Sequence, residues 1–207
     1  MNRTEILALV FNLLLVVLEL RAVVLCHRRY PQSWILPLKF YTVQSNLFTL
    51  FSSSAFSIYA MAGLLGSGSK MPAWVTVSRF LSTVDMALTF FIVLLVLMPE
   101  EYRQGKGMKI FYDRDQLYHH LICPWLTMIS FVCFEPSLPA TFFWFWIGAV
   151  PTMIYGVIAL IINASGIASG PYSFLLVRQQ PVWKSILWIV LVFAIVLVLS
   201  TILLILA

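Results

Sequence analysis

The sequence predicts an all-α membrane protein: a bundle of six transmembrane helices with short loops and no soluble domain. The 207 residues are 61% hydrophobic and only 10% charged, and the mean hydropathy is +0.96. This is more apolar surface than a soluble domain of the same size can bury. Six stretches also approach or exceed the roughly 20 apolar residues that cross a hydrocarbon core about 30 Å thick. We therefore expect residues 1–207 to form a single transmembrane domain.

The expected helices follow from the apolar stretches and their interruptions. The first resembles a secretory signal in having Arg3 before an apolar run, but Glu19 and Arg21 interrupt it and no small-residue cleavage site follows. We interpret it as a retained helix. The fourth is the shortest and contains Pro124, which neighbouring helices in a membrane can accommodate. The helices are expected near residues 5–26, 41–65, 74–98, 117–134, 140–163 and 183–206.

Lys and Arg are distributed unequally between the two sides of the membrane. One side carries Arg3 and Lys70, whereas the loops after helices 1, 3 and 5 carry Arg28, Arg29, Lys39, Arg103, Lys106, Lys109, Arg114, Arg178 and Lys184. The positive-inside rule therefore places loops 1, 3 and 5 in the cytoplasm and both termini outside the cell membrane. Contact with anionic lipids explains the basic loops. We expect membrane lipids and no nucleic acid as partners, and the oligomeric state stays open.

The usual signatures of soluble enzymes are absent from the sequence. It contains no phosphate-binding glycine loop, no G-x-S-x-G turn and no H-E-x-x-H helix. We expect no cofactor and no metal. The adjacent His119 and His120 point about 100° apart on a helix, and only Asp85 or Glu135 is a nearby third ligand.

Ionisable residues at membrane depth are costly and are therefore functional candidates. Glu19 and Arg21 lie near the inner end of the first helix, where a paired Glu and a snorkelling Arg are ordinary. Arg79 lies near the outer end of the third helix, and we expect it to reach the interface. Asp85, near the middle of the same span, must find a partner, be protonated or line a wet cavity.

The start of the second helix is unusually rich in hydrogen-bonding side chains. Thr42 lies three residues beyond Lys39 and His120 five beyond Asp115, or about 4.5 and 7.5 Å along their helices. We therefore expect Thr42 and His120 at nearly the same depth, with Asn46 on the helical face of Thr42. A hydroxyl beside an imidazole is the minimum apparatus for nucleophilic acyl transfer. The alternatives are a threonine bonded to a backbone carbonyl or packed at a helix contact, and histidines that form an interfacial pair or half of a metal site.

Three short motifs carry a resemblance to a known family. "KFYT" before "QSNLF", a membrane histidine and "GPYSFLLV" resemble the androgen-induced gene 1 / FAR-17a family and its bacterial branch, often labelled Pr6Pr membrane proteins. The bacterial pattern F-T-x-x-S-N-L is matched from Tyr41 to Leu47, with Tyr replacing Phe, and H-x-x-x-P is matched by His120 and Pro124. A Y-P-[YF]-P-F-L-like segment is matched by Pro171, Tyr172, Phe174 and Leu175, whereas Ser173 departs from its proline.

The resemblance implies a six-helix membrane protein and, from the animal members, a threonine hydrolase that cleaves fatty acid esters of hydroxy fatty acids. The nucleophile carries over onto Thr42. Spacing to the proline selects His120 as the general base in the bacterial pattern and His119 in the animal pattern. A lipid ester substrate would place its carbonyl beside Thr42 near the cytoplasmic interface, where Asn46 or Ser45 would donate to the oxyanion.

Other roles remain open for several residues. Tyr172 and Asp85 are further candidates for orienting the imidazole or closing the site, and an interhelical hydrogen bond is the alternative for Asn46. A small transporter or lipid-binding membrane protein is the competing function, based on Asp85 in mid-span and on Pro124 and Pro151 within helices. These prolines fall in successive helices rather than in matching halves, so transport ranks second. A structural membrane subunit is also compatible with the chain.

Overall fold

The computed structural model describes residues 3–66, 70–136 and 138–207, and all regular structure in these ranges is helical. Each expected span is present, with bounds within five residues of those predicted. The predicted six-helix membrane fold is therefore confirmed. The spans long and apolar enough to cross a membrane are Arg3–Arg29, Tyr41–Leu64, Ala73–Arg103, Asp115–Phe134, Phe142–Ala164 and Val182–Leu206.

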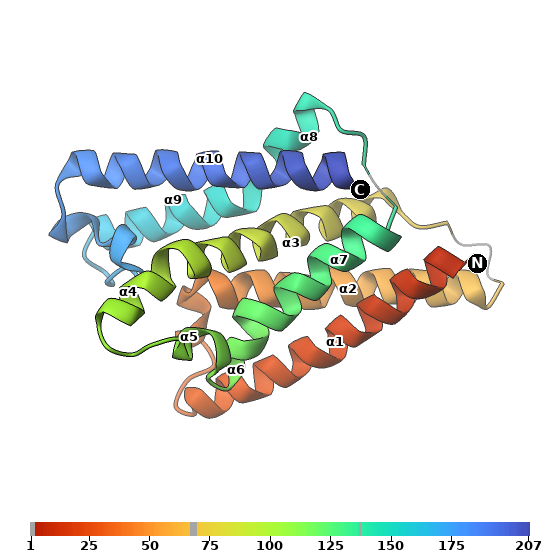
Figure 1. The fold of residues 1–207 in the computed structure, drawn as a ribbon, viewed down its shortest axis with the longest axis horizontal. Coiled ribbons are helices and arrows are strands. Elements are labelled where there is room, and N and C mark those ends of the chain that lie inside the picture. Colours follow the sequence, from red (N-terminus) through yellow and green to blue (C-terminus); the bar gives the residue numbers. More distant parts are fainter. Residues whose placement is uncertain (1–2, 67–69, 137) are drawn as a thin grey trace.

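The chain runs back and forth along one axis (Figure 1). The long helices are α1 (Arg3–Arg29), α2 (Tyr41–Leu64), α3 (Ala73–Ile92), α7 (Cys123–Phe134), α9 (Val150–Ala164) and α10 (Val182–Leu206). The shorter ones are α4 (Met98–Arg103), α5 (Lys109–Tyr112), α6 (Asp115–Leu117) and α8 (Phe142–Ile147). Both termini lie at one end of the bundle with loops 2 and 4, and loops 1, 3 and 5 lie at the other (Figure 1). The basic loops therefore share one end, and its cytoplasmic location stays a prediction.

The bundle is organised around α3, the most buried of the six spans. Helices α2 and α7 pack against α3, and α1 packs against those two, while α9 and α10 lie along the other side of α3 (Figure 1). Phe80 and Val84 of α3 join Phe131 of α7 and Val196 of α10 in the largest buried apolar cluster. This cluster fixes the relative positions of the helices that carry the candidate site.

Two spans widen into π-helix immediately before a proline. The segment Val93–Leu97 precedes Pro99, and Tyr118–Ile122 precedes Pro124. Proline lacks an N–H group, and its ring crowds the carbonyl four residues earlier, which for Pro124 is the carbonyl of His120. A π turn relieves this crowding without ending the helix. Pro124 therefore accounts for the irregular backbone on which both histidines are carried.

The fifth span is interrupted between α8 and α9 because α10 passes close to it. A Cβ atom on Gly148 would collide with the Ser200 side chain and touch Phe80. Small residues allow this kind of close approach between membrane helices. Pro151 then falls in the first turn of α9, where its missing N–H leaves no intrahelical bond unmade. The proline marks the start of a helix rather than a kink inside one.

Arg79 does not reach the interface, so the expectation from its position in the sequence is wrong. Its side chain is 1% exposed, and Nε and Nη2 donate to the two carboxylate oxygens of Glu135 at 2.8 Å each. Nη1 donates to Ser53 at 2.9 Å, and Asn12 and Ser130 donate to the same carboxylate at 2.9 and 2.6 Å. A bidentate partner inside the bundle satisfies the guanidinium, so it has no need to snorkel.

Glu19 and Arg21, for which a paired carboxylate and a snorkelling guanidinium are the ordinary interpretation, have different surroundings. Glu19 is fully buried beside the Cys123 thiol, whereas the Arg21 guanidinium lies 5.7 Å from the centroid of the Tyr118 ring. The two side chains are two residues apart and leave α1 in different directions, because residues i and i+2 do not share a helical face.

Candidate functional site

Thr42 lies at the start of α2, at the end of the bundle that carries the basic loops. The turn Leu36–Lys39 leads into the extended N-cap residue Phe40, so Thr42 occupies the first helical turn. Backbone N–H groups there have no carbonyl partner within their own helix. The Thr42 N–H instead donates to the Tyr172 hydroxyl at 3.4 Å. The side-chain hydroxyls of Thr42 and Tyr172 are 3.2 Å apart.

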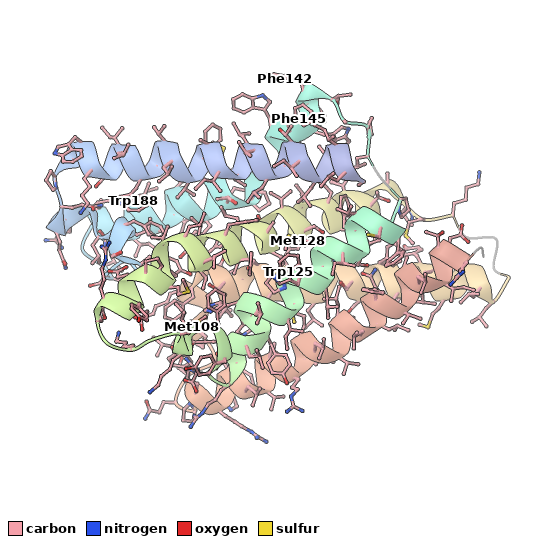
Figure 2. The ribbon with its side chains drawn as sticks, viewed as in Figure 1. Met108, Trp125, Met128, Phe142, Phe145 and Trp188 are labelled. Atoms are coloured by element: carbon pink, nitrogen blue, oxygen red, sulfur yellow. The ribbon has the colours of Figure 1, made fainter. Side chains whose placement is uncertain are left out.

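Aromatic contacts hold Tyr172 in this position. Its ring stacks on Phe174 at a centroid distance of 5.3 Å and meets the edge of Phe40 at 6.3 Å. Phe174 in turn contacts Trp188 at 5.4 Å, and Figure 2 shows Trp188 on the side of α10 that faces α9. Burial raises the pKa of the Tyr172 phenol above its ordinary value. The hydroxyl therefore keeps its proton at neutral pH and is available as a hydrogen-bond donor.

Ser173, which departs from the proline of the family pattern, has its own contact. Its hydroxyl donates to Glu100 Oε2 at 2.9 Å. Glu100 belongs to α4, at the end of the third span. The bond ties the connection before α10 to the same end of the bundle and helps to fix the neighbouring Tyr172.

The two histidines differ in their hydrogen bonding. Nδ1 of His120 lies 2.6 Å from the carbonyl oxygen of Ile110 in α5. A carbonyl oxygen can only accept, so Nδ1 carries the proton and Nε2 is left as the basic nitrogen. His119 is 3% exposed, and neither of its ring nitrogens has a hydrogen-bond partner in the part of the chain that the structure describes. Only His120 is therefore held in a defined tautomer by its surroundings.

A polar cavity of about 420 Å³ joins the threonine to the histidines. Thr42, His119, His120 and Tyr172 all line it. No hydrogen bond links Thr42 to either imidazole in the described part of the chain. The common depth expected from the sequence thus brings the groups to one cavity, where a water molecule or a substrate would have to lie between them.

A second cavity, apolar and of about 360 Å³, lies on the other side of Thr42. Its walls come from α3, α9 and α10, including Leu88, Gly156 and Trp188. Thr42 and Tyr172 line both cavities. Their hydroxyls therefore lie at the boundary between an apolar space and a polar one.

The remaining candidates from the sequence bond elsewhere. Asn46 Nδ2 donates to the carbonyl of Thr42 at 2.7 Å and to that of His119 at 3.4 Å, which is the interhelical bond named as the alternative to an oxyanion role. Ser45 donates to the same Thr42 carbonyl at 3.0 Å. Both donors support the backbone beneath Thr42 and do not line the polar cavity.

Asp85 is separated from the histidines by its bonding partners. Tyr41 donates to Asp85 Oδ1 at 2.8 Å, and Thr152 donates to the same oxygen at 3.3 Å. The Tyr41 and Thr152 hydroxyls also contact each other at 2.8 Å. The mid-span carboxyl thus accepts hydrogen bonds from hydroxyls of α2 and α9, and in the described residues it has no hydrogen bond to an imidazole.

Sequence reasoning missed several members of this region. The Ile110 carbonyl reaches His120 from loop 3, and no side-chain pattern identifies a backbone acceptor. Cys26, Asp115 and His119 place one potential ligand atom each within 4.8 Å of the others, although only Asp85 and Glu135 were considered as partners for a histidine. The position of Cys26 at the end of the first span that carries basic loop 1 was the available signal.

Comparison of the chain with protein-family models, with characterised proteins and with solved structures finds no match to any of them.

Proposed function

We propose that the chain is an integral membrane threonine hydrolase of lipid esters, with Thr42 as nucleophile and His120 as general base. One observation carries the proposal: the Thr42 hydroxyl lies where an apolar cavity meets a polar cavity that contains a tautomerically fixed histidine. A lipid ester has the same division, with apolar chains on either side of a polar carbonyl. The resemblance of the "KFYT" and H-x-x-x-P segments to a family with such enzymes points to the same chemistry.

The two cavities suggest how a substrate would lie. Apolar cavities of several hundred cubic ångströms bury most of a small ligand's surface, so an acyl chain would occupy the space between α3, α9 and α10. The ester carbonyl would then reach Thr42. The polar cavity, which Arg29, Glu100 and Glu101 also line, would supply water and receive the polar product.

The chemistry proceeds in two half-reactions. The Thr42 oxygen attacks the carbonyl carbon while His120 Nε2 takes the hydroxyl proton. The tetrahedral intermediate then releases the alcohol, which receives that proton from His120, and leaves an acyl-threonine. Water attacks the acyl group, its proton passing to His120, and collapse returns a proton to Thr42 as the fatty acid leaves.

Tyr172 is the best placed donor for the negative oxygen of the intermediates. Its hydroxyl lies 3.2 Å from the Thr42 oxygen and retains its proton. The first-turn position of Thr42 adds the positive end of the α2 dipole at the same place. The gap between Thr42 and His120 is compatible with catalysis, because such hydrogen bonds tighten when substrate binds.

His120 is favoured over His119 as the general base because its Nδ1 atom has a hydrogen-bond partner. The Ile110 carbonyl plays the orienting role that a carboxylate plays in other nucleophile–histidine arrangements. His119 has no such partner among the described residues. We therefore assign the base to His120.

The experiment is labelling and turnover in the purified full chain. Detergent-solubilised protein is treated with a fluorophosphonate probe and assayed on a panel of lipid esters for the wild type, Thr42→Ala and His120→Ala. Both variants should lose hydrolysis and Thr42→Ala should lose labelling. Thr49→Ala is the matched control. It removes a buried hydroxyl from the same helix, and this hydroxyl has no hydrogen-bond partner among the described residues. Undiminished labelling of Thr42→Ala would eliminate the nucleophile.

A lipid-binding or transport protein is the second candidate, and the apolar cavity favours it independently of any chemistry. If the wild type neither hydrolyses an ester nor reacts with the probe, but retains a lipid through purification as measured by native mass spectrometry, this candidate replaces the hydrolase.

A further inference from the structure

A buried corner of the polar cavity contains three metal-ligating side chains from two spans. Cys26 lies in the last turn of α1, while Asp115 and His119 lie one turn apart at the start of the fourth span. All three are at most 5% exposed. One ligand atom from each lies within 4.8 Å of the other two.

The hydrogen bonding of this corner is incomplete. Among the described residues neither ring nitrogen of His119 has a hydrogen-bond partner, whereas Asp115 Oδ1 pairs with Arg29 Nε at 2.8 Å. Buried polar groups without partners are rare and costly in proteins. A cation between the three side chains would give the buried His119 imidazole the partner that it lacks among the described residues.

The charges of the surrounding groups point the same way. Arg29 is shared between two carboxylates, since it also contacts Asp113 Oδ2 at 3.1 Å. With a neutral Cys26 thiol the cluster therefore carries one excess negative charge. A divalent ion that binds Cys26 as thiolate would bring this total to zero.

We propose that Cys26, Asp115 and His119 form a binding site for a divalent transition-metal ion of the zinc type. A mixed sulfur, nitrogen and oxygen ligand set suits Zn²⁺ and its neighbours rather than Mg²⁺ or Ca²⁺, which prefer oxygen ligands. Ligand atoms around tetrahedral zinc are roughly 3.5 Å apart, from bond lengths of about 2.0–2.3 Å. Small rotations of the three side chains close the difference from the observed spacing.

The fourth coordination position would open to the polar cavity, because all three side chains line it. A water molecule is therefore the expected fourth ligand, as in sites with three protein ligands. The ion would also tie the end of α1 to the start of the fourth span. If the hydrolase proposal holds, the ion occupies His119 and leaves His120 as the base, so the two histidines have separate tasks.

The test measures metal and does not depend on ester hydrolysis. The full chain, purified in detergent with an affinity tag that contains no histidine, is titrated with Co²⁺ and with Zn²⁺. We expect about one ion per chain and a near-ultraviolet charge-transfer band from a cobalt–thiolate bond. Cys26→Ser should abolish the band, and Asp115→Asn and His119→Gln should each weaken binding by at least about 100-fold, more than loss of a supporting residue does.

Two controls match the ligands in residue type. Cys133→Ser removes an exposed cysteine, and His120→Gln removes the histidine that is bonded to Ile110; both variants should bind one ion with the same band. A wild-type protein that binds no Co²⁺, or binds it with an unchanged band in Cys26→Ser, would overturn the site. The wild-type titration decides the first of these outcomes without any variant, so a variant that fails to fold does not obscure it.

Discussion

The hydroxyl oxygens of Thr42 and Tyr172 lie 3.2 Å apart, although the two residues are 130 positions apart in the chain. Thr42 is the second residue of α2, and Tyr172 belongs to the connection before α10. Their contact brings together two segments of the motif-bearing sequence at the boundary between the apolar and polar cavities. A phenol beside a nucleophilic hydroxyl can stabilise the charge that develops when that hydroxyl attacks a carbonyl.

Tyr172→Phe should therefore lower kcat for ester hydrolysis by about 100-fold, the typical result of removing one oxyanion donor. KM should change little, because the ring contacts with Phe174 and Phe40 remain. Tyr155→Phe is the matched control: Tyr155 lines the same apolar cavity, but its hydroxyl donates to the Lys39 carbonyl. Equal losses in steady-state assays of the two variants would argue against a specific role for Tyr172.

The apolar cavity should set the acyl-chain length that the protein accepts. Gly156 lines this cavity, and a Cβ atom there meets nothing within 4 Å, so a larger side chain can start at this position, and Gly156→Phe should occupy part of the cavity. Displacing about three methylene groups at about 0.8 kcal/mol each would reduce kcat/KM for long chains roughly 50-fold. Short-chain esters should be spared.

Gly156→Ala is the control for this change, since it also replaces the glycine by a residue with a side chain but fills little of the cavity. A chain-length series measured for both variants separates the two effects. If Gly156→Phe lowers activity equally for short and long esters, the chain does not lie in this cavity.

Asp85→Asn should distinguish hydrolysis from proton-coupled transport. Asp85 accepts hydrogen bonds from Tyr41 and Thr152, and an amide oxygen can accept both. We expect turnover to change by less than about tenfold, a barrier change below about 1.4 kcal/mol. A transporter that uses the carboxyl to carry a proton would lose all coupled flux in proteoliposomes, and that result, with hydrolysis absent, would favour the second candidate.

The orientation of the bundle can be measured with single cysteines in a Cys133→Ser background, because Cys26 and Cys123 are buried. Gln104→Cys places a thiol at the end with loops 1, 3 and 5, and Lys70→Cys places one at the other end. An impermeant maleimide should label intact cells only through Lys70→Cys, and Gln104→Cys should react after lysis. The opposite pattern would place the termini in the cytoplasm.

The spans could be predicted from the sequence because their length and apolar content are local properties. The π-helical turn at Tyr118–Ile122 was not predicted, although Pro124 is its cause. A similar depth for Thr42 and His120 could be predicted by counting residues from the charged residues that precede them. The groups around them could not be predicted from the sequence. The Ile110 carbonyl and the Tyr172 hydroxyl contact them from other segments of the chain, and these contacts depend on how the loops fold over the end of the bundle.

The partner of Arg79 is another long-range contact that was not predicted from the sequence. Its depth was predicted from its distance to the helix end, but its partner Glu135 directly follows the fourth span, 56 positions away in the chain. Arg79 also donates to Ser53, which gives one of the hydroxyls of α2 a charged partner inside the bundle. Opposite charges near the same end of adjacent spans were the available signal for this pair.

The Arg79–Glu135 pair should matter for stability far more than a surface pair does. Glu135→Leu leaves a guanidinium that is 1% exposed without its carboxylate, and breaking a buried pair in this way typically costs about 3–5 kcal/mol. The double variant Arg79→Met with Glu135→Leu removes both charges and should recover most of that loss, because the pair itself adds little over well-packed apolar side chains. Reversible unfolding in mixed micelles measures the free energy of each variant. The control is Lys106→Ala, which breaks the exposed pair with Glu101 and should cost no more than about 1 kcal/mol. If the double variant is as unstable as Glu135→Leu, the hydrogen-bond network of Asn12, Ser53 and Ser130 depends on the two charges themselves.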